Sequence, residues 1–123
     1  MDYSAFIKQA HEVARPIYPS DKCQAGTVGA AIVSSSGQTY TGICLDFSCS
    51  LGFCAEHAAI AEMLKHHESE IAYVVAVNHE GEIFSPCGRC REMMWQLNEK
   101  NRSAMVILSS DEAHTLGELL PFK

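Results

Sequence analysis

Two short segments, C-A-E at residues 54–56 and P-C-G-R-C at residues 86–90, place the strongest constraint on how this chain can fold. Together they offer three thiolates, from Cys54, Cys87 and Cys90, and one carboxylate, from Glu56. Three protein ligands leave one position of a tetrahedral zinc ion open, as in a catalytic rather than a structural site. The fold is therefore expected to bring these two segments together around a single metal ion.

The local surroundings of these residues suit hydrolytic chemistry. Water in the open position of a zinc ion becomes acidic enough to react near neutral pH. A carboxylate beside that water, here Glu56, can move the protons of the reaction. Cys54 and Cys87 each precede a predicted helix, where the unpaired N–H groups of the first turn stabilise a thiolate. The pattern predicts zinc at the three cysteines and a proton carrier at Glu56.

The pair of motifs resembles the cytidine deaminase family, and within it the small blasticidin-S deaminases, over about residues 28 to 122. The resemblance implies that Cys54, Cys87 and Cys90 bind Zn²⁺ while Glu56, which is not a ligand, acts as general acid and base. It also implies a hydrolase that converts the amino group of a cytosine-type nucleoside to the oxo form and releases ammonia. The expected substrate is cytidine, deoxycytidine or an aminopyrimidine nucleoside similar to blasticidin S.

A cationic side chain is expected near the metal, because three thiolates carry more negative charge than one Zn²⁺ ion neutralises. Arg89, between the two later ligands, is the first candidate, and Arg91 is the second. Similar nucleoside-type cytidine deaminases place an Arg directly after C-A-E, where this chain has His57. Blasticidin-S deaminases instead resemble this chain in carrying the Arg inside P-C-G-R-C.

The residues expected to hold the sugar depart from the family pattern. Nucleoside cytidine deaminases similar to this chain carry G-x-N-x-E after a hairpin, where Asn and Glu bind the ribose. The matching stretch at residues 42–46 is G-I-C-L-D, so Cys44 replaces the Asn and Asp46 replaces the Glu. Asp46 can serve as a shorter hydrogen-bond acceptor, whereas the Cys44 thiol lacks the donor and acceptor groups of an amide.

Aromatic contacts with the substrate are expected from a different position than in the family. The Phe that stacks on the base in similar proteins is replaced by Gly26, which leaves Phe47 or Phe53 to supply an aromatic face. The resemblance also assigns substrate contacts to Ala55, within C-A-E, and to Phe122. In the family the corresponding terminal Phe reaches the site of a neighbouring subunit, which implies a homotetramer, or at least a homodimer.

Hydrophobic periodicity and turn residues predict the following elements. They are a helix over residues 3–15, hairpin strands at 28–33 and 38–44, helices over 54–66 and 88–100, strands at 71–77 and 104–108, and a short helix or turn at 115–119. Late strands that alternate with helices predict parallel neighbours, whereas the hairpin is antiparallel. We expect a single domain over residues 1–123 with an α/β fold and a mixed sheet of five strands or fewer. The resemblance implies three α/β/α layers.

Charge and composition limit the partners and the location. The net charge of −6 disfavours a nucleic-acid polymer, because such partners are bound through Lys and Arg. The chain has no apolar run near the roughly 20 residues that span a membrane, and its first residues lack the pattern of a signal peptide. We therefore expect a cytoplasmic protein that acts on a small neutral or cationic molecule.

Other interpretations of the same residues stay open. The cysteines fit a closed structural zinc site, with Cys44 or Cys49 as the fourth ligand, in a binding module without activity. Cys87 and Cys90 alone fit a thioredoxin-like redox pair. Among enzymes, a deaminase of a free base or a purine is favoured by the missing ribose residues. A deaminase of tRNA or single-stranded DNA is disfavoured by the acidic charge.

Overall fold

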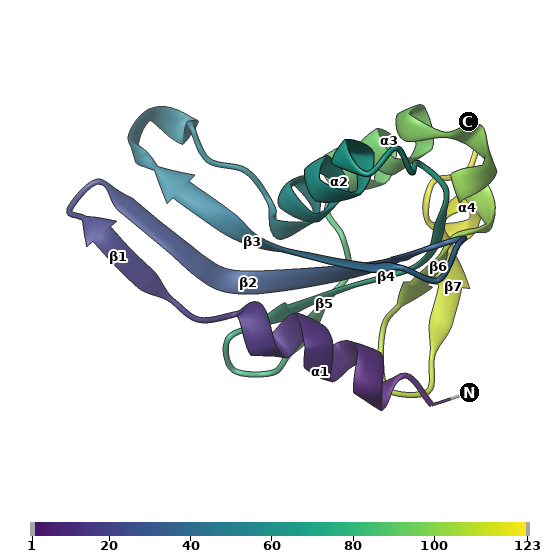
Figure 1. Cartoon of the computed structure of the whole chain (residues 1–123), viewed down its shortest axis with the longest axis horizontal. Helices are drawn as coiled ribbons and strands as arrows, with labels where there is room; N and C mark the ends of the chain where they lie inside the picture. The colour runs from purple at the N-terminus through teal and green to yellow at the C-terminus, as the bar shows by residue number, and fades with distance from the viewer. Residues whose placement is uncertain (1, 123) are drawn as a thin grey trace.

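The computed structural model describes residues 2–122, which form a mixed seven-stranded sheet with helices on both faces (Figure 1). Helix α1 (Ser4–Val13) covers one face of the sheet. Helices α2 (Ala55–Lys65), α3 (Gly88–Leu97) and α4 (Leu116–Leu119) lie on the opposite side. The predicted α/β fold and its three α/β/α layers are therefore confirmed.

Two long antiparallel strands, β2 (Cys23–Ser34) and β4 (Ile71–Asn78), form the centre of the sheet. Strand β3 (Thr39–Phe47) pairs with the other edge of β2 to complete the predicted hairpin. Four shorter strands extend the sheet, namely β1 (Ile17–Ser20), β5 (Ile83–Phe84), β6 (Met105–Ile107) and β7 (Ala113–Thr115). Only β4 and β6 run parallel, and all the other described pairs are antiparallel, so the sheet is mixed as predicted.

The sheet has seven strands rather than five or fewer, and β1, β5 and β7 account for the difference. Strand β1 lies outside the predicted elements; it contains Pro19, and all its residues are exposed. Strand β2 begins earlier than predicted and β3 ends later, since their pairing continues beyond an irregularity between Ala25 and Gly29. Helix α3 ends at Leu97 rather than near residue 100, and a 3₁₀ helix over Glu99–Ser103 follows it.

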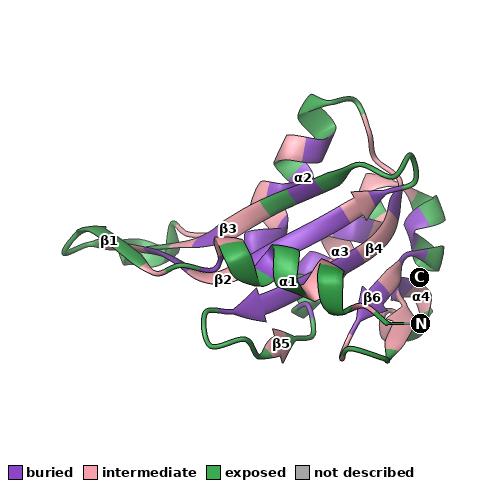
Figure 2. Ribbon diagram, turned by 60° about the horizontal axis from the view of Figure 1, so that its bottom comes forward, coloured by how far each residue is buried: buried purple, intermediate pink, exposed green. Residues whose placement is uncertain are grey.

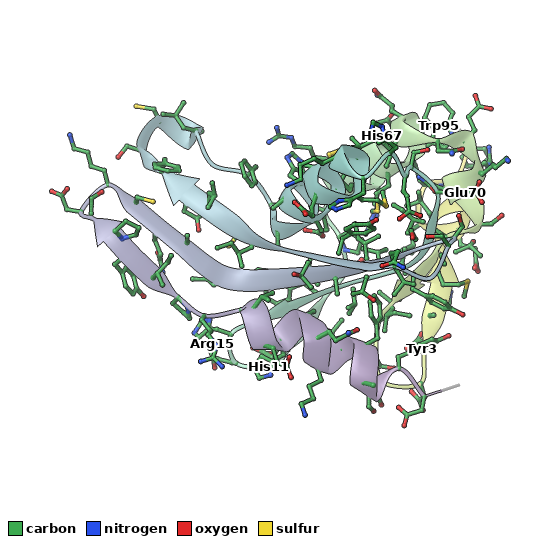
Figure 3. The ribbon with its side chains drawn as sticks, in the orientation of Figure 1. Tyr3, His11, Arg15, His67, Glu70 and Trp95 are labelled. Atoms are coloured by element: carbon green, nitrogen blue, oxygen red, sulfur yellow. The ribbon has the colours of Figure 1, made fainter. Side chains whose placement is uncertain are left out.

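The central strands are largely buried, as the purple of Figure 2 shows, and apolar clusters lie on both of their faces. Neighbouring residues of a strand point to opposite faces. Ile32 and Val74 accordingly belong to the cluster beneath α2 and α3, whereas Ala31 and Val75 belong to the cluster beneath α1. Near the start of α1 the ring of Tyr3 packs on Tyr73 with centroids 6.0 Å apart (Figure 3). Burial on both faces explains why β4 is a continuous apolar run.

Helix α2 lies directly against β3 because Gly42 has no side chain. A Cβ atom at Gly42 would come within 2.4 Å of the Ala59 nitrogen and 2.7 Å of the Ala55 carbonyl oxygen. Such distances are shorter than real Cβ contacts, so only glycine allows this approach. The close packing fixes the first turn of α2 above β3, and this turn carries the C-A-E motif.

Candidate active site

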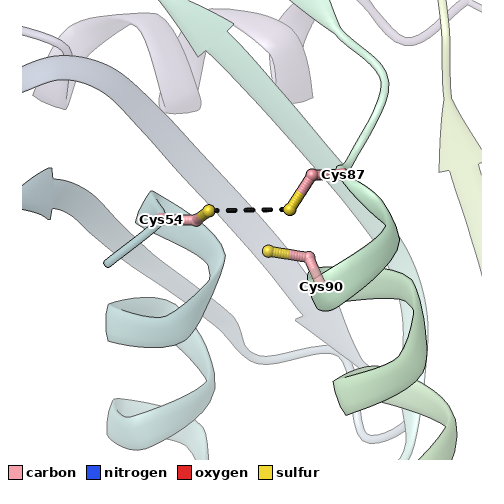
Figure 4. Close-up of side chains that lie close together, drawn as sticks. All are labelled: Cys54, Cys87 and Cys90. Carbon is pink, nitrogen blue, oxygen red and sulfur yellow. Dashed lines mark hydrogen bonds between the residues drawn. The ribbon is translucent and has the colours of Figure 1, made fainter. Parts of the chain in front are cut away.

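The three predicted ligands meet where α2 and α3 begin. Cys54 is the N-cap residue of α2, Cys87 is the N-cap residue of α3, and Cys90 lies in the first turn of α3. Their sulfur atoms all lie within 4.8 Å of one another, and those of Cys54 and Cys87 are 3.7 Å apart (Figure 4). Sulfur ligands about 2.3 Å from a tetrahedral zinc are separated by about 3.8 Å, so the donor set fits this metal.

The two cysteines considered as a fourth ligand lie elsewhere. Within residues 2–122, the three cysteine sulfurs form a group of possible metal-ligand atoms that lie within 4.8 Å of one another, and no fourth ligand atom belongs to this group. The Cys44 sulfur instead accepts a hydrogen bond from the Val28 N–H group at 3.3 Å. Cys49 is exposed in a 3₁₀ helix over Ser48–Ser50. The described residues therefore form a three-ligand set rather than a closed four-cysteine site.

Burial and hydrogen bonding act differently on the three thiols in the metal-free protein. Burial raises the pKa of Cys54 and, more strongly, that of Cys90. Burial also works against ionisation of Cys87, but hydrogen bonds from the Cys90 backbone N–H and from the neighbouring thiols outweigh it, so the pKa of Cys87 is lowered. Cys87 is thus the first of the three to ionise and to offer a thiolate to a metal.

Glu56 lies in the first turn of α2 with only 4% of its surface exposed. Burial raises the pKa of its carboxyl group, and hydrogen bonds from its own backbone N–H and from the Cys90 thiol partly oppose this effect. The residue also lines the pocket beside the three sulfurs. A buried carboxyl group at the edge of a pocket suits a proton carrier, because it is protected from bulk water.

A pocket of about 500 Å³ opens beside the sulfur atoms, between β2, β3 and the starts of α2 and α3. Four of the predicted substrate residues line it: Cys44, Asp46, Phe47 and Ala55. The fifth, Phe122, is outside the set of lining residues, and its side chain is fully exposed. Within a single chain, therefore, the structure brings together all the predicted substrate residues except Phe122.

The two predicted arginines have different surroundings. Arg89 lines the pocket and lies close enough to His57 to help burial lower the pKa of that imidazole. Arg91 is outside the set of lining residues, and its guanidinium donates to the Pro86 carbonyl oxygen at 2.9 Å and to the Leu119 carbonyl oxygen at 3.3 Å. Because Pro86 precedes Cys87, Arg91 anchors the segment that carries this ligand to the C-terminal helix.

The pocket also contains residues that the sequence did not single out, including Thr27, Ser50, Phe84 and Ser85. The Thr27 hydroxyl forms a hydrogen bond with the Cys44 sulfur at 3.2 Å. The position of Thr27 in the pocket wall depends on the irregular pairing between β2 and β3 around residues 25–29. Local sequence patterns carry no signal for such an irregularity, so Thr27 was missed.

The family model of the cytidine and deoxycytidylate deaminase zinc-binding region matches residues 1–106. This match includes all three cysteines and Glu56. The chain belongs to this deaminase family. Membership confirms the predicted class of enzyme, a zinc-dependent hydrolase that acts on a C–N bond.

Individual cytidine deaminases are similar to this chain in sequence and in structure. The cytidine deaminase of Mycobacterium tuberculosis is 32% identical over 95 residues, which are 76% of this chain and 69% of that protein. A crystal structure of a mutant cytidine deaminase from the same organism superposes with a TM-score of 0.82 at 25% identity, covering 99% of this chain and 94% of that one. The cytidine deaminase of Burkholderia pseudomallei gives a TM-score of 0.77 at 26% identity, covering 99% and 98% of the two chains. The deaminase fold thus extends over nearly the whole chain.

Proposed function

We propose that this deaminase hydrolyses the amino group of cytidine or deoxycytidine, with zinc held by Cys54, Cys87 and Cys90 and protons carried by Glu56. The proposal rests mainly on the three-sulfur set, of which Cys54 and Cys87 line one pocket together with the buried carboxyl group of Glu56. A structural zinc site would have no use for a carboxyl group in this position. The relatives that bear the name cytidine deaminase support the choice of substrate.

The chemistry divides between the metal and the carboxylate. Zinc at the three thiolates would supply a Lewis acid that makes water nucleophilic near neutral pH. The Glu56 carboxylate accepts a proton from the attacking water and passes it to the ring nitrogen N3. Once the water oxygen is bonded to C4, Glu56 takes the second proton from that hydroxyl group and delivers it to the amine, so that the C4–N bond breaks and the C4 oxygen becomes the oxo group. Water is consumed, and one ammonia leaves for each oxo product formed.

The polar wall of the pocket supports a nucleoside rather than a free base. Asp46 stands at the mouth of the pocket with an exposed carboxylate that can accept hydrogen bonds from sugar hydroxyls. The Cys44 thiol donates a hydrogen bond to the Asp46 Oδ2 atom at 3.9 Å, which limits the movement of the carboxylate. We assign Ala55 and Phe47, which also line the pocket, to contacts with the base and with the sugar edge.

We assign the balancing positive charge near the thiolates to Arg89, because it lines the pocket and lies between two ligands in sequence. We do not assign the balancing charge to Arg91, because its guanidinium donates hydrogen bonds to the Pro86 carbonyl, the Leu119 carbonyl and the Ser85 hydroxyl. Its proposed role is to hold the segment before Cys87 in place.

We further propose a homotetramer in which Phe122 of one subunit contacts the pocket of another. The fully exposed side chain of Phe122 supports this, because a large apolar residue gains stability when a partner covers it. We place the protein in the cytoplasm, where the reducing environment keeps thiols free for metal binding. All six cysteines are free in the structure. Within residues 2–122, no helix has the length and apolar character needed to span a membrane.

A substrate panel tests the proposed function. Zinc-loaded protein is incubated with cytidine, deoxycytidine, cytosine, blasticidin S and guanine, and ammonia is measured over time. We expect release from cytidine and deoxycytidine, with kcat/KM well above that for cytosine. Preference for blasticidin S would move the assignment to that class of nucleoside. Preference for cytosine or guanine would favour the free-base alternative. Bound zinc with no ammonia from any compound would indicate a binding module and overturn the proposal.

A further inference from the structure

We propose that Phe53, supported from behind by His57, forms the aromatic surface on which the substrate ring stacks. The inference rests on the proposed function, since it assigns a specificity-determining residue within the same pocket. Phe53 lines the pocket directly before the first metal ligand, Cys54. Its ring is therefore close to the place where the reacting end of a planar base must lie.

The position at which the family carries its stacking Phe is closed to any side chain here. Gly26 has a φ of +80°, and a Cβ atom there would lie 2.2 Å from the Arg15 carbonyl oxygen. An aromatic residue cannot occupy this site without moving the Arg15 backbone. A planar ring bound in the pocket must therefore find its aromatic contact elsewhere.

The backbone of Phe53 is fixed more firmly than a loop residue usually is. Its N–H donates to the Leu45 carbonyl at 2.9 Å, and its carbonyl accepts from the Leu45 N–H at 3.0 Å. This isolated bridge pins the residue against β3 between Cys44 and Asp46, which both line the pocket. A side chain on a fixed backbone loses little further freedom when a ligand packs on it.

The ring of Phe53 is also held in orientation. The His57 imidazole stacks on it with centroids 5.7 Å apart and planes 17° from parallel. His57 belongs to the first turns of α2 and is only half exposed, and its Nε2 atom is buried without a hydrogen-bond partner. The imidazole therefore contributes to this site through its ring face, while Phe53 itself lines the pocket.

The remaining aromatic residues of the wall are less suited to this role. Phe47 and Phe84 both line the pocket, but their side chains are 43% and 45% exposed. No ring contact within residues 2–122 supports either of them. An exposed ring without an aromatic neighbour loses more entropy on stacking than a preorganised one does.

The test compares Phe53→Leu with the matched variant Phe84→Leu, at a lining aromatic residue to which no substrate contact is assigned. Both changes keep apolar bulk and remove an aromatic face from the same wall. Uridine, the product that lacks the reactive amine, is titrated calorimetrically into zinc-loaded protein. We expect Phe53→Leu to weaken uridine binding about tenfold, within the effect of losing a base–aromatic stack, and Phe84→Leu to change it less than about twofold. Tenfold corresponds to about 1.4 kcal/mol.

His57 acts as a positioning residue, so its test includes a rescue. His57→Ala removes the support and should weaken uridine binding, whereas His57→Phe restores a stacked ring and should return the affinity toward that of the wild type. Zinc content and thermal unfolding are measured for every variant, so that loss of metal or of folding is recognised. Only variants with wild-type zinc content are compared.

Several outcomes would overturn the inference. These are unchanged uridine binding in Phe53→Leu, a larger loss in Phe84→Leu, or equal binding by His57→Ala and His57→Phe. In each of these cases cytidine deamination by the wild-type protein would leave the proposed function standing. A wild-type protein that releases no ammonia from cytidine and does not bind uridine would overturn both the function and this inference.

Discussion

At the scale of single residues, the site depends on one carboxyl group that stands beside the metal ligands without joining them. Glu56 is buried, lines the pocket and has a pKa raised by its burial. The three sulfur atoms form a ligand group of their own within the described residues. Removing the acid–base function of Glu56 should therefore separate turnover from metal binding.

We expect Glu56→Gln to lower kcat for cytidine by at least about 10²- to 10⁴-fold, the range that a positioned general acid–base group supplies. Zinc content should stay near that of the wild type. The matched control is Glu62→Gln, which alters a carboxylate of α2 that forms an exposed ion pair with Lys65 at 3.2 Å. Substantial activity in Glu56→Gln, with zinc bound, would rule out the assigned role.

A second carboxylate, that of Glu68, contributes to how stability depends on pH. Glu68 accepts hydrogen bonds from the hydroxyl groups of Ser36 and Tyr40. These bonds lower the pKa of Glu68 below its ordinary value of 4.5, and the same carboxylate raises the pKa of Tyr40 to about 12. The Glu68 contribution is thus present above pH 4.5 and is lost as the pH falls through the lowered pKa. The Tyr40 contribution is present below its ordinary pKa of 10.0 and is lost as the pH rises through about 12.

Chemical unfolding of the wild type and Glu68→Ala, measured as a function of pH, tests whether the Glu68 contribution to stability is lost as the pH falls. We expect the wild type to be more stable at neutral pH, and the difference to shrink toward zero as the pH falls well below 4.5. Glu70→Ala is the control, because it removes only an exposed ion pair with Lys100 at 3.6 Å. A stability difference that stayed constant down to strongly acidic pH would contradict the assignment.

At the scale of elements, the site is built from two helix starts on one face of the sheet. The sequence placed these starts correctly, because Cys54 and Cys87 precede apolar helical patterns and now occupy the N-cap positions. It also predicted the buried strand β4 from the run at 71–77. Long elements with strong periodicity are determined by their own residues, since many positions repeat the same signal.

The elements that the sequence did not predict are short and take their structure from their partners. Strand β5 has two residues, and β7 has three. All four residues of β1 are exposed, and Pro19 lies among them. Their backbone groups pair with β2, β4 and β6, so tertiary contacts rather than local propensity decide their conformation. The irregular pairing of β2 with β3 near Gly26, which shapes one wall of the pocket, was missed for the same reason.

The contact between α2 and β3 gives a prediction at this scale. Gly42→Ala should lower the free energy of unfolding by about 1–3 kcal/mol, because the new methyl group must displace the backbone of α2. Gly88→Ala is the control, since a Cβ atom there meets no atom within 4 Å. Denaturant unfolding of the metal-free proteins measures both changes. Equal stability of Gly42→Ala and the wild type would show that the helix can move away without cost.

At the scale of the whole molecule, the fold places the pocket on the face of the sheet that carries α2 and α3, while α1 closes the other face (Figure 1). The core therefore continues through both faces, and the site is supported from beneath by buried strands. Exposed apolar side chains remain at the surface, with Phe122 the most exposed of them. In the proposed homotetramer, Phe122 contacts the pocket of a neighbouring subunit.

The proposed homotetramer predicts a native mass four times that of one chain, measured by sedimentation equilibrium. Phe122→Ala should leave the thermal unfolding of the subunit nearly unchanged, because the side chain buries no surface within the chain. It should lower kcat/KM for cytidine, because the neighbouring pocket loses a contact. A fully active monomer, or an unaffected Phe122→Ala enzyme, would contradict the proposed arrangement.

X-ray absorption at the zinc edge tests most directly whether Cys54, Cys87 and Cys90 alone hold the metal. We expect one zinc per chain with three sulfur neighbours at about 2.3 Å and a fourth position not filled by sulfur. Replacing Cys87 with Ser should lower the sulfur count or abolish zinc binding, whereas Cys49→Ser should leave the spectrum unchanged. Four sulfur neighbours in the wild type would show a closed structural site and would contradict the catalytic role proposed for this centre.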